Sequence, residues 1–261
     1  MSAAALPILL RSLGLTTMAR EHDTALARAE AEDWGYPRLL RHLVETEANE
    51  RLRRRVERLL KESHLPANKP LASVDHARLP DKVRRQLPTL LTGEFVRRGD
   101  NLLCFGLPGR GKTLFLAALC RELVQQHQLP VLYTTAHRLV TELLIAKRDL
   151  KLERLIAKLD RFAALAIDDL GYTQQSREEM EVLFTLLAER YEKKSVLLTS
   201  NLVFSQWDQI FKDPMMTMAA VDRLVHHAVI LEFNGDSYRA DRIVVDRSSY
   251  PTPPNGALFF N

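Results

Sequence analysis

A loop built to hold phosphate constrains this chain more than any other feature. Residues 106–113 read Gly-Leu-Pro-Gly-Arg-Gly-Lys-Thr, which fits the pattern G-x-x-x-x-G-K-[ST]. The apolar run 102–105 precedes the loop and a helical pattern over 114–126 follows it, as a P-loop requires. Glycines let backbone N–H groups converge on phosphates, and the helix adds its positive N-terminal end. The sequence therefore predicts an α/β domain that binds a nucleotide.

We expect ATP at this loop, together with Mg²⁺. Lys112 should reach the β- and γ-phosphates, and the Thr113 hydroxyl is suited to Mg²⁺, whose other positions phosphate oxygens and water would fill. The expected ATP contacts within the loop and the start of the helix are Gly106, Leu107, Pro108, Gly109, Arg110, Gly111, Lys112, Thr113 and Leu114.

A pair of carboxylates ends another apolar run further along the chain. Residues 164–169 read Ala-Leu-Ala-Ile-Asp-Asp, the Walker B pattern. We expect Asp168 to hold Mg²⁺ and Asp169 to orient or deprotonate the attacking water; the plainer alternative is that they cap the following helix. Many such ATPases have Glu at the position of Asp169, so the shorter side chain predicts slow turnover.

Short apolar runs alternate with long amphipathic stretches after residue 100. The runs cover 101–105, 131–135, 164–167, 196–199 and 228–233. This alternation predicts a five-stranded parallel sheet between helices. Upstream, helical spacing with almost no glycine predicts a small all-helical domain over 1–64, and four prolines mark a linker over 65–90. The ATPase domain is expected over 91–247, followed by a tail over 248–261.

Composition excludes a disordered or membrane-spanning chain. Hydrophobic residues make up 46% and charged residues 27%, close to soluble globular averages. The apolar stretch 3–10 is too short to span a membrane, and we expect a cytoplasmic protein. Cys104 and Cys120 are expected to be reduced core thiols. The net charge of +4 permits an anionic partner without requiring one.

The order of motifs after the Walker elements carries a family resemblance. These motifs are Ile167-Asp-Asp-Leu-Gly-Tyr172, which overlaps the second Walker element, Leu183-Phe184, Glu189-Arg-Tyr-Glu192, Thr199-Ser-Asn201, Trp207, Asp222-Arg-Leu-Val-His-His227 and Ser237-Tyr-Arg239. With the Walker elements, they resemble the AAA+ ATPases of the IstB/DnaC group, and within it the IstB-like helpers of insertion-sequence transposition. The resemblance covers roughly residues 65–242. It implies an AAA+ domain, a homo-oligomeric ring or spiral, and a transposase as partner.

Three further site residues follow from this resemblance. Asn201 takes the sensor 1 position, although a strand-end Asn is commonly a turn residue. Arg223 matches the position of an arginine finger that enters the neighbouring subunit's site; the alternative is a surface ion pair with Asp222 or Glu232. Arg239 matches a second sensor that contacts the nucleotide phosphates, or is purely structural.

The adjacent His226 and His227 are expected to be packing or subunit-contact residues. Neighbouring side chains on a helix or strand point in different directions, which predicts a poor metal pair.

Two basic clusters are candidates for binding the phosphate backbone of double-stranded DNA. Arg51, Arg54, Arg55 and Arg58 follow helical spacing, although Glu47, Glu50 and Glu57 could pair with them on a solvated helix. Lys147, Arg148 and Lys151, with Arg154 and Lys158, lie in the single helix expected after the second strand. Neither cluster is interleaved with aromatic residues, so we expect weak sequence preference.

The favoured function is an ATP-dependent, DNA-bound assembly factor that recruits or stimulates a transposase. A DnaC-like loader of a replicative helicase is the alternative within the same group. A small-molecule kinase and a nucleotide-gated scaffold with negligible hydrolysis are hypotheses from other classes, and the latter is motivated by Asp169.

Overall fold

The chain folds as two units, Met1–Lys61 and Glu62–Asn261, which are treated separately below. The computed structural model describes residues 5–171, 176–207, 210 and 213–234. Among these residues, no helix combines the length and the apolar character needed to cross a membrane.

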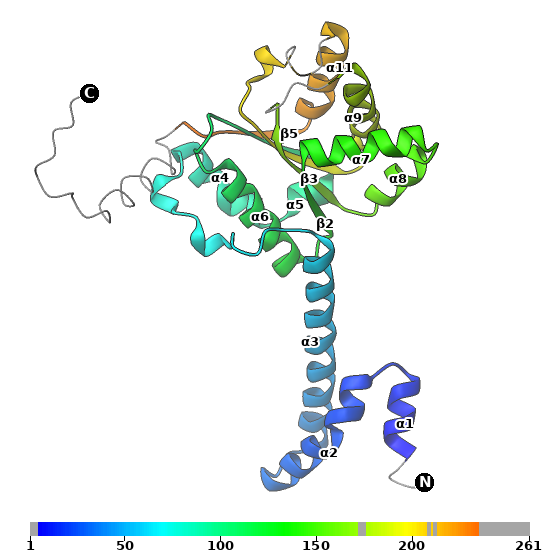
Figure 1. The fold of residues 1–261 in the computed structure, drawn as a ribbon. Coiled ribbons are helices and arrows are strands. Elements are labelled where there is room, and N and C mark those ends of the chain that lie inside the picture. Colours follow the sequence, from blue (N-terminus) through cyan, green and yellow to red (C-terminus); the bar gives the residue numbers. More distant parts are fainter. Residues whose placement is uncertain (1–4, 172–175, 208–209, 211–212, 235–261) are drawn as a thin grey trace, which may run out of the picture. The chain divides into compact units, whose positions relative to one another are not determined.

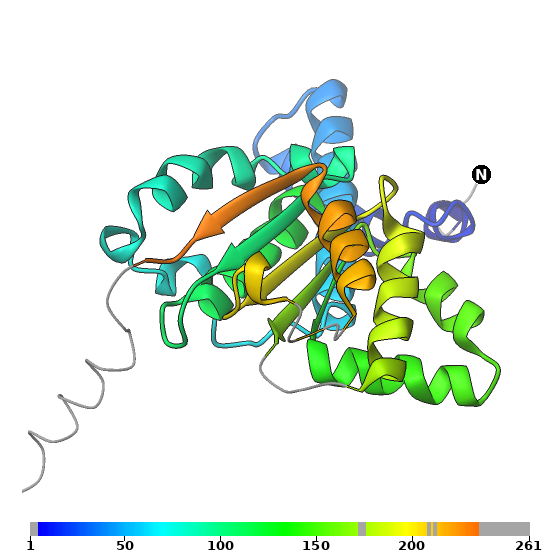
Figure 2. The ribbon, with the colours of Figure 1, turned by 90° about the horizontal axis from the view of Figure 1, so that it is seen from above.

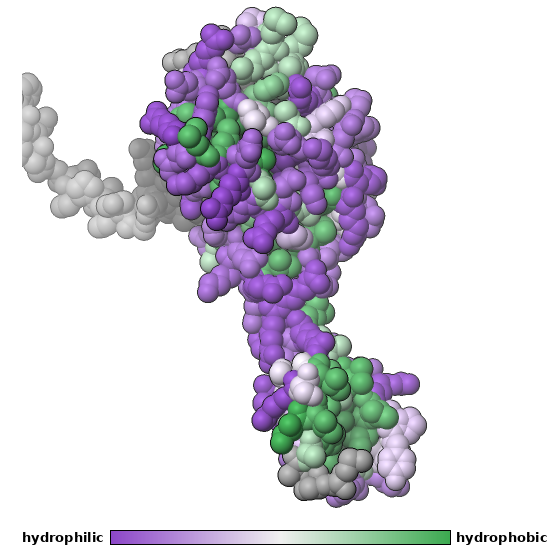
Figure 3. All heavy atoms as spheres, turned by 90° about the vertical axis from the view of Figure 1, so that its right-hand side faces the viewer, coloured by the Kyte–Doolittle hydropathy of each residue, from purple (hydrophilic) through white to green (hydrophobic). Residues whose placement is uncertain are grey.

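The first unit consists of the helices α1 (Ala5–Ser12), α2 (Thr16–Ala31) and α3 (Tyr36–Glu62) (Figure 1). Helix α2 has no side-chain cap of its own, and Glu47 of α3 supplies one: its Oε2 accepts from the backbone N–H groups of Thr17 at 2.7 Å and Met18 at 3.0 Å. Apolar side chains gather on one face of this unit (Figure 3). The exposed ones on and just after α1 are Leu6, Ile8, Leu9 and Leu13.

The second unit contains a five-stranded parallel sheet in the order β2-β3-β4-β1-β5 (Figures 1 and 2). The strands are β1 (Asn101–Phe105), β2 (Val131–Thr135), β3 (Ala164–Leu170), β4 (Ser195–Ser200) and β5 (Ala228–Glu232). This confirms the predicted fold class and all five strands; β3 runs three residues further than the apolar run that predicted it. In this order β4 separates β1, which leads into the phosphate loop, from β3, which ends in the carboxylates.

Helices cover both faces of the sheet. They are α4 (Asp81–Leu91), α5 (Glu94–Arg98), α6 (Lys112–His127), α7 (Ala136–Arg148), α8 (Leu152–Leu159), α9 (Arg177–Arg190) and α11 (Pro214–Val225). Alternate residues of a strand point to opposite faces. Leu103 and Phe105 of β1 accordingly belong to the core cluster that includes α7, α9 and α11. Cys104 is fully buried, as is Cys120 of α6, so both thiols are in the core.

Residues 65–90, which we expected to connect the two parts, carry structure of their own. Two short 3₁₀ helices, η1 (Leu71–Ser73) and η2 (His76–Arg78), precede α4, and another, η3 (Phe204–Gln206), follows β4. Val74, Leu79, Val83 and Leu87 are at most 5% exposed. Because these apolar side chains are buried, the segment contributes to the second unit's core, while its four prolines lie partly or fully exposed.

Candidate nucleotide site

The loop between β1 and α6 depends on glycines at positions that other residues fit poorly. Gly106, Gly109 and Gly111 have φ values of +148°, +80° and +87°. A Cβ atom on Gly106 would lie 2.6 Å from the carbonyl oxygen of Phe233, whose N–H donates to Phe105 where β1 ends. The close approach of β5 and the turn into α6 therefore both need glycine, as a phosphate cradle does.

Two polar side chains start α6 inside this loop. Lys112 is 5% exposed, and its Nζ donates to the carbonyl oxygens of Gly106 at 2.5 Å and Leu107 at 3.0 Å. Its charge is thus held over the loop. The Thr113 hydroxyl donates to Asp168 Oδ1 at 3.1 Å, so a hydroxyl and a carboxylate suited to Mg²⁺ lie side by side.

Asp168 is held by hydroxyl groups from the two strands that flank β3. Thr199 of β4 donates to Oδ1 at 2.5 Å, and Tyr133 of β2 donates to Oδ2, also at 2.5 Å. Asp168 itself is 2% exposed. Burial, and then the negative charge of Asp168, raise the pKa of Tyr133, so its hydroxyl stays protonated and remains a donor.

Tyr133 and Thr199 are site residues that sequence reasoning missed. Each carries a hydroxyl group in a strand next to the carboxylate-bearing strand, and that is the signal that could have found them. Recognising it requires the strand order, which the sequence pattern alone does not supply.

A β-bulge gives the two carboxylates different surroundings. The register of β3 with β4 shifts between Ile167 and Leu170, and Asp169 takes a left-handed φ of +62°. The Asp169 N–H donates to the Thr199 hydroxyl at 2.9 Å, so Thr199 bonds to both carboxylate residues. Asp169 is partly exposed where Asp168 is buried, which leaves it accessible to a reacting water.

Asn201 directly follows β4, the strand between β1 and β3. Its side-chain oxygen is buried and has no hydrogen-bond partner within the described residues. A buried amide oxygen without a partner is costly, and a water or ligand would satisfy it. This observation suits a residue that contacts a ligand at the site.

The residues present fit ATP and Mg²⁺. The glycine cradle, the buried Lys112, the paired Thr113 and Asp168, and the unpartnered Asn201 oxygen lie at the carboxyl ends of β1, β3 and β4. Parallel sheets place their ligands at this edge.

Comparison with known proteins decides the family. The model of the IstB-like ATP-binding proteins matches residues 8–244. The chain belongs to this family. An insertion-sequence ATP-binding protein of Sinorhizobium fredii is 42% identical over 237 residues, which cover 90% of this chain and 79% of that one. A protein named for insertion sequence IS21 of Pseudomonas aeruginosa is 35% identical over 235 residues, covering 90% and 88%.

Solved structures of the replication initiator DnaA share the fold of this chain. The AMPPCP-bound DnaA of Aquifex aeolicus aligns with a TM-score of 0.53 at 17% identity, over 71% of this chain and 56% of that one. DnaA bound to AMPPCP and single-stranded DNA aligns with the same score at 16% identity, over 70% and 55%. The IstB-like chain thus spans about half the length of these structures.

Arg223 lies away from the phosphate loop of its own IstB-like chain. Its backbone oxygen accepts from Asn101, the first residue of β1, whereas the loop follows the last residue. The guanidinium donates to Ala219 at 3.0 Å and stacks 4.7 Å from the ring centre of Phe184, rather than pairing with Asp222 or Glu232. Arg223 also lines a pocket of about 480 Å³ with Arg98, Tyr191 and Glu192. Arg223 therefore lies near the start of β1, at the opposite end of that strand from the phosphate loop.

The arginines of α3 differ in their contacts. Arg51 pairs with Glu47 at 2.8 Å and donates to Gly14, and Arg54 pairs with Glu50 at 2.9 Å, so both stabilise the first unit. Arg55 and Arg58 are exposed and make no ion pair or hydrogen bond with another described residue.

The second basic cluster does not lie on one helix, and that prediction is wrong. Helix α7 ends at Arg148, Leu150 adopts φ +57°, and α8 begins at Leu152. A left-handed residue cannot continue an α-helix. Lys147 pairs with Glu181 and Lys151 with Asp149, while Arg148 is exposed. The remaining candidate, Arg239, and the tail 248–261 lie outside the described residues.

Proposed function

We propose that this IstB-like protein is a Mg²⁺-dependent ATPase that assembles on double-stranded DNA and recruits or stimulates the transposase of an insertion sequence. The observation that carries the proposal is the buried Asp168 carboxylate, bonded by Thr113, Tyr133 and Thr199 beside the glycine loop. The relatives named for insertion sequences support the setting in transposition.

The chain's own residues divide the work of nucleotide binding. The backbone N–H groups of residues 106–114, except Pro108, and the Lys112 ammonium would bind the phosphates, and Thr113 and Asp168 would hold Mg²⁺. Mg²⁺ supplies neutralisation of phosphate charge. Asp169 and Asn201 would orient the attacking water, and Asp169 would accept its proton.

Hydrolysis is proposed to be slow and to depend on assembly. The short Asp169 side chain lies farther from a bound water than Glu would, and misplacement of about 1 Å can cost a hundredfold in rate. Arg223 is remote from its own chain's loop, so it would complete the site of a neighbour in a ring or spiral. ATP would thereby link adjacent subunits.

DNA binding is proposed to use backbone phosphates. The exposed Arg55 and Arg58 support a contact through α3, and Arg148 supports a second through the end of α7. Arg51, Arg54, Lys147 and Lys151 would add charge to these surfaces while keeping their partners.

Calorimetric titration of the full chain with an ATP analogue and Mg²⁺ tests the proposal. We expect one nucleotide per chain, and larger particles in light scattering when duplex DNA is added. Lys112→Ala should weaken nucleotide affinity by about tenfold or more, because a charge-assisted hydrogen bond contributes about 1.5–3 kcal/mol. Lys82→Ala, which removes an exposed lysine of α4, is the matched control. Wild-type nucleotide affinity in a folded Lys112→Ala variant would overturn the site.

A further inference from the structure

The end of α11 brings two consecutive histidines together. The helix ends at Val225, and His226 caps it, with its N–H donating to Asp222. His227 connects the helix to β5, and its carbonyl oxygen accepts from Asn101. The ring centres lie 4.3 Å apart. The expectation that the two side chains diverge is wrong, because both follow the last residue of α11 and precede β5, so neither helical nor strand spacing applies.

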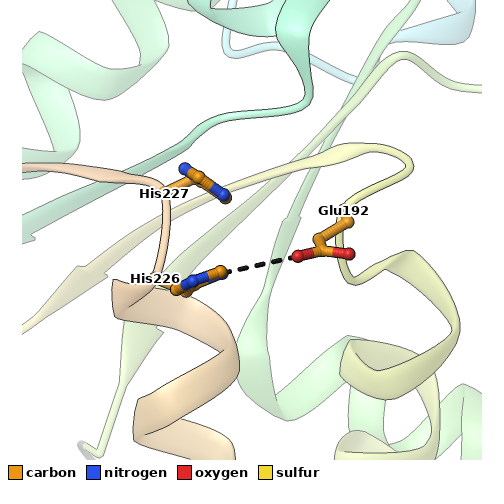
Figure 4. A group of neighbouring side chains, drawn as sticks. All are labelled: Glu192, His226 and His227. Carbon is orange, nitrogen blue, oxygen red and sulfur yellow. Dashed lines mark ion pairs between the residues drawn. The ribbon is translucent and has the colours of Figure 1, made fainter.

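A carboxylate from another part of the chain completes a cluster with these histidines (Figure 4). Glu192 lies in the turn between α9 and β4, where it adopts φ +57°. One of its carboxylate oxygens is 3.5 Å from His226 Nδ1. Each of the three exposed residues offers a ligand atom, and these atoms all lie within 4.8 Å of one another.

We propose that Glu192, His226 and His227 form a binding site for a divalent transition-metal ion, with Zn²⁺ as the best match. Imidazole nitrogens and one carboxylate oxygen suit Zn²⁺, whereas Mg²⁺ and Ca²⁺ prefer oxygen ligands alone. Tetrahedral ligands at zinc distances lie about 3.4 Å apart. Since all three side chains are exposed, small rotations can close the cluster from its present spread.

The surroundings of the cluster are compatible with a cation. The Tyr191 hydroxyl lies 2.9 Å from His226 Nδ1, and a metal on that nitrogen would displace this partly exposed hydroxyl to water. Three protein ligands leave a fourth position for water or for a residue of another molecule.

A bound metal would join two junctions that are remote in sequence. Glu192 belongs to the turn before β4, and the histidines belong to the junction before β5. The ion would therefore fix the last turn of α11, which carries Arg223, against the end of α9. This site lies apart from the phosphate loop, so its test is independent of the proposed ATPase function.

The test uses the full chain, freed of any polyhistidine tag and treated with a chelator. Calorimetry with Zn²⁺ should give one saturable site per chain, and the thermal unfolding midpoint should rise with Zn²⁺. X-ray absorption of the zinc complex should show nitrogen and oxygen ligands at about 2.0–2.2 Å.

Matched variants assign the ligands. Glu192→Gln and His227→Gln should each weaken Zn²⁺ binding by more than about tenfold, since even the outer partners of a metal commonly contribute that much. His137→Gln, which changes an exposed histidine of α7, should bind Zn²⁺ as the unchanged chain does. Nucleotide binding should be retained in all three, which shows that they are folded. The proposal is overturned if no saturable Zn²⁺ site exists, or if the two cluster variants bind as tightly as His137→Gln.

Discussion

The Asp168 carboxylate accepts three hydroxyl hydrogen bonds, one each from Thr113, Tyr133 and Thr199. Only the Thr113 hydroxyl comes from the P-loop motif. The other two fix the carboxylate from β2 and β4, so its orientation is set by the sheet before any metal binds. This arrangement reduces the reorganisation that metal binding requires.

Tyr133→Phe tests this pre-orientation. We expect ATP binding to persist while turnover falls and needs more Mg²⁺ to saturate, because Asp168 Oδ2 loses its donor. The free energy of unfolding should fall by about 1.5–3 kcal/mol, as for loss of a bond to a charged group. Turnover against Mg²⁺ concentration and urea unfolding are the measurements. Tyr36→Phe, at a residue 86% exposed, is the control, and an Mg²⁺ dependence equal to that control would contradict the role.

The residues of the nucleotide site were predictable to different degrees. Lys112, Thr113 and Asp168 belong to motifs whose chemistry is local, and the structure brings all three together. Tyr133 and Thr199 reach Asp168 only through the order β2-β3-β4, which no local pattern encodes. The left-handed bulge at Asp169 was likewise invisible, because a two-residue Asp pattern does not reveal a register shift.

At the scale of elements, the strands were predictable because buried parallel strands are continuous apolar runs. The interruption between α7 and α8 was not, since the pattern of Leu143, Leu152 and Leu155 fits one long helix. Leu150 is 94% exposed at that turn, although an apolar residue in this pattern would be expected to be buried. The capping of α2 by Glu47 is similarly a tertiary contact between elements distant in sequence.

Glu47→Gln tests how far α2 depends on α3. Burial raises the pKa of Glu47, but bonds from Met18, Arg51 and Thr17 outweigh it and hold the pKa below its usual value. Because the pKa of this carboxyl is lower in the folded than in the unfolded chain, the ionised group stabilises the fold fully at pH values above its unfolded pKa of about 4.3. This stabilisation is lost as the pH falls through the folded-state pKa. The substitution should remove this acid dependence and cost about 1 kcal/mol, as loss of a helix cap does.

Hydrogen exchange at the Thr17 and Met18 amides, followed as pH is lowered, measures the effect directly. Glu45→Gln, at an exposed glutamate on the same helix, should leave exchange at these amides unchanged. If the Thr17 and Met18 amides were as well protected from exchange in the Glu47→Gln variant as in the unchanged chain, the cap would be dispensable.

At the scale of the whole molecule, we propose that Arg223 completes the nucleotide site of a neighbouring chain, because it lies near the start of β1 and the phosphate loop follows its end. Arg223→Ala should keep nucleotide binding but lower turnover of the assembled protein by about 10³-fold or more, the contribution of an arginine finger. Mixing the Arg223→Ala and Lys112→Ala variants should restore part of the turnover. Where the two variants are neighbours, one supplies an intact Lys112 and the other an intact Arg223, which together make a complete site. ATPase assays of each variant and of the mixture are the measurement, with Arg138→Ala as the control. A mixture as inactive as its parts would mean that Arg223 acts within its own chain.

DNA binding by the assembled protein should depend on salt through its unpaired arginines. Removing Arg55 and Arg58 together should reduce the slope of log affinity against log salt by about 1.8, if each neutralises one phosphate. Arg53→Ala removes a charge already bonded to Glu50 and Glu57, and should change the slope less. Fluorescence anisotropy measures the slope. If the slope is unchanged in the double variant, the DNA-binding surface lies elsewhere, and Arg148 and its neighbours become the candidates.

Both native thiols of this chain lie in the core of the second unit. Burial raises the pKa of Cys104 and of Cys120, and the thiolate is the reactive form. A maleimide dye should therefore label neither native cysteine, but should react with a cysteine introduced at a solvent-facing site such as Leu150. The wild-type sequence is thus already a suitable background for single-site fluorescent labelling of subunit exchange.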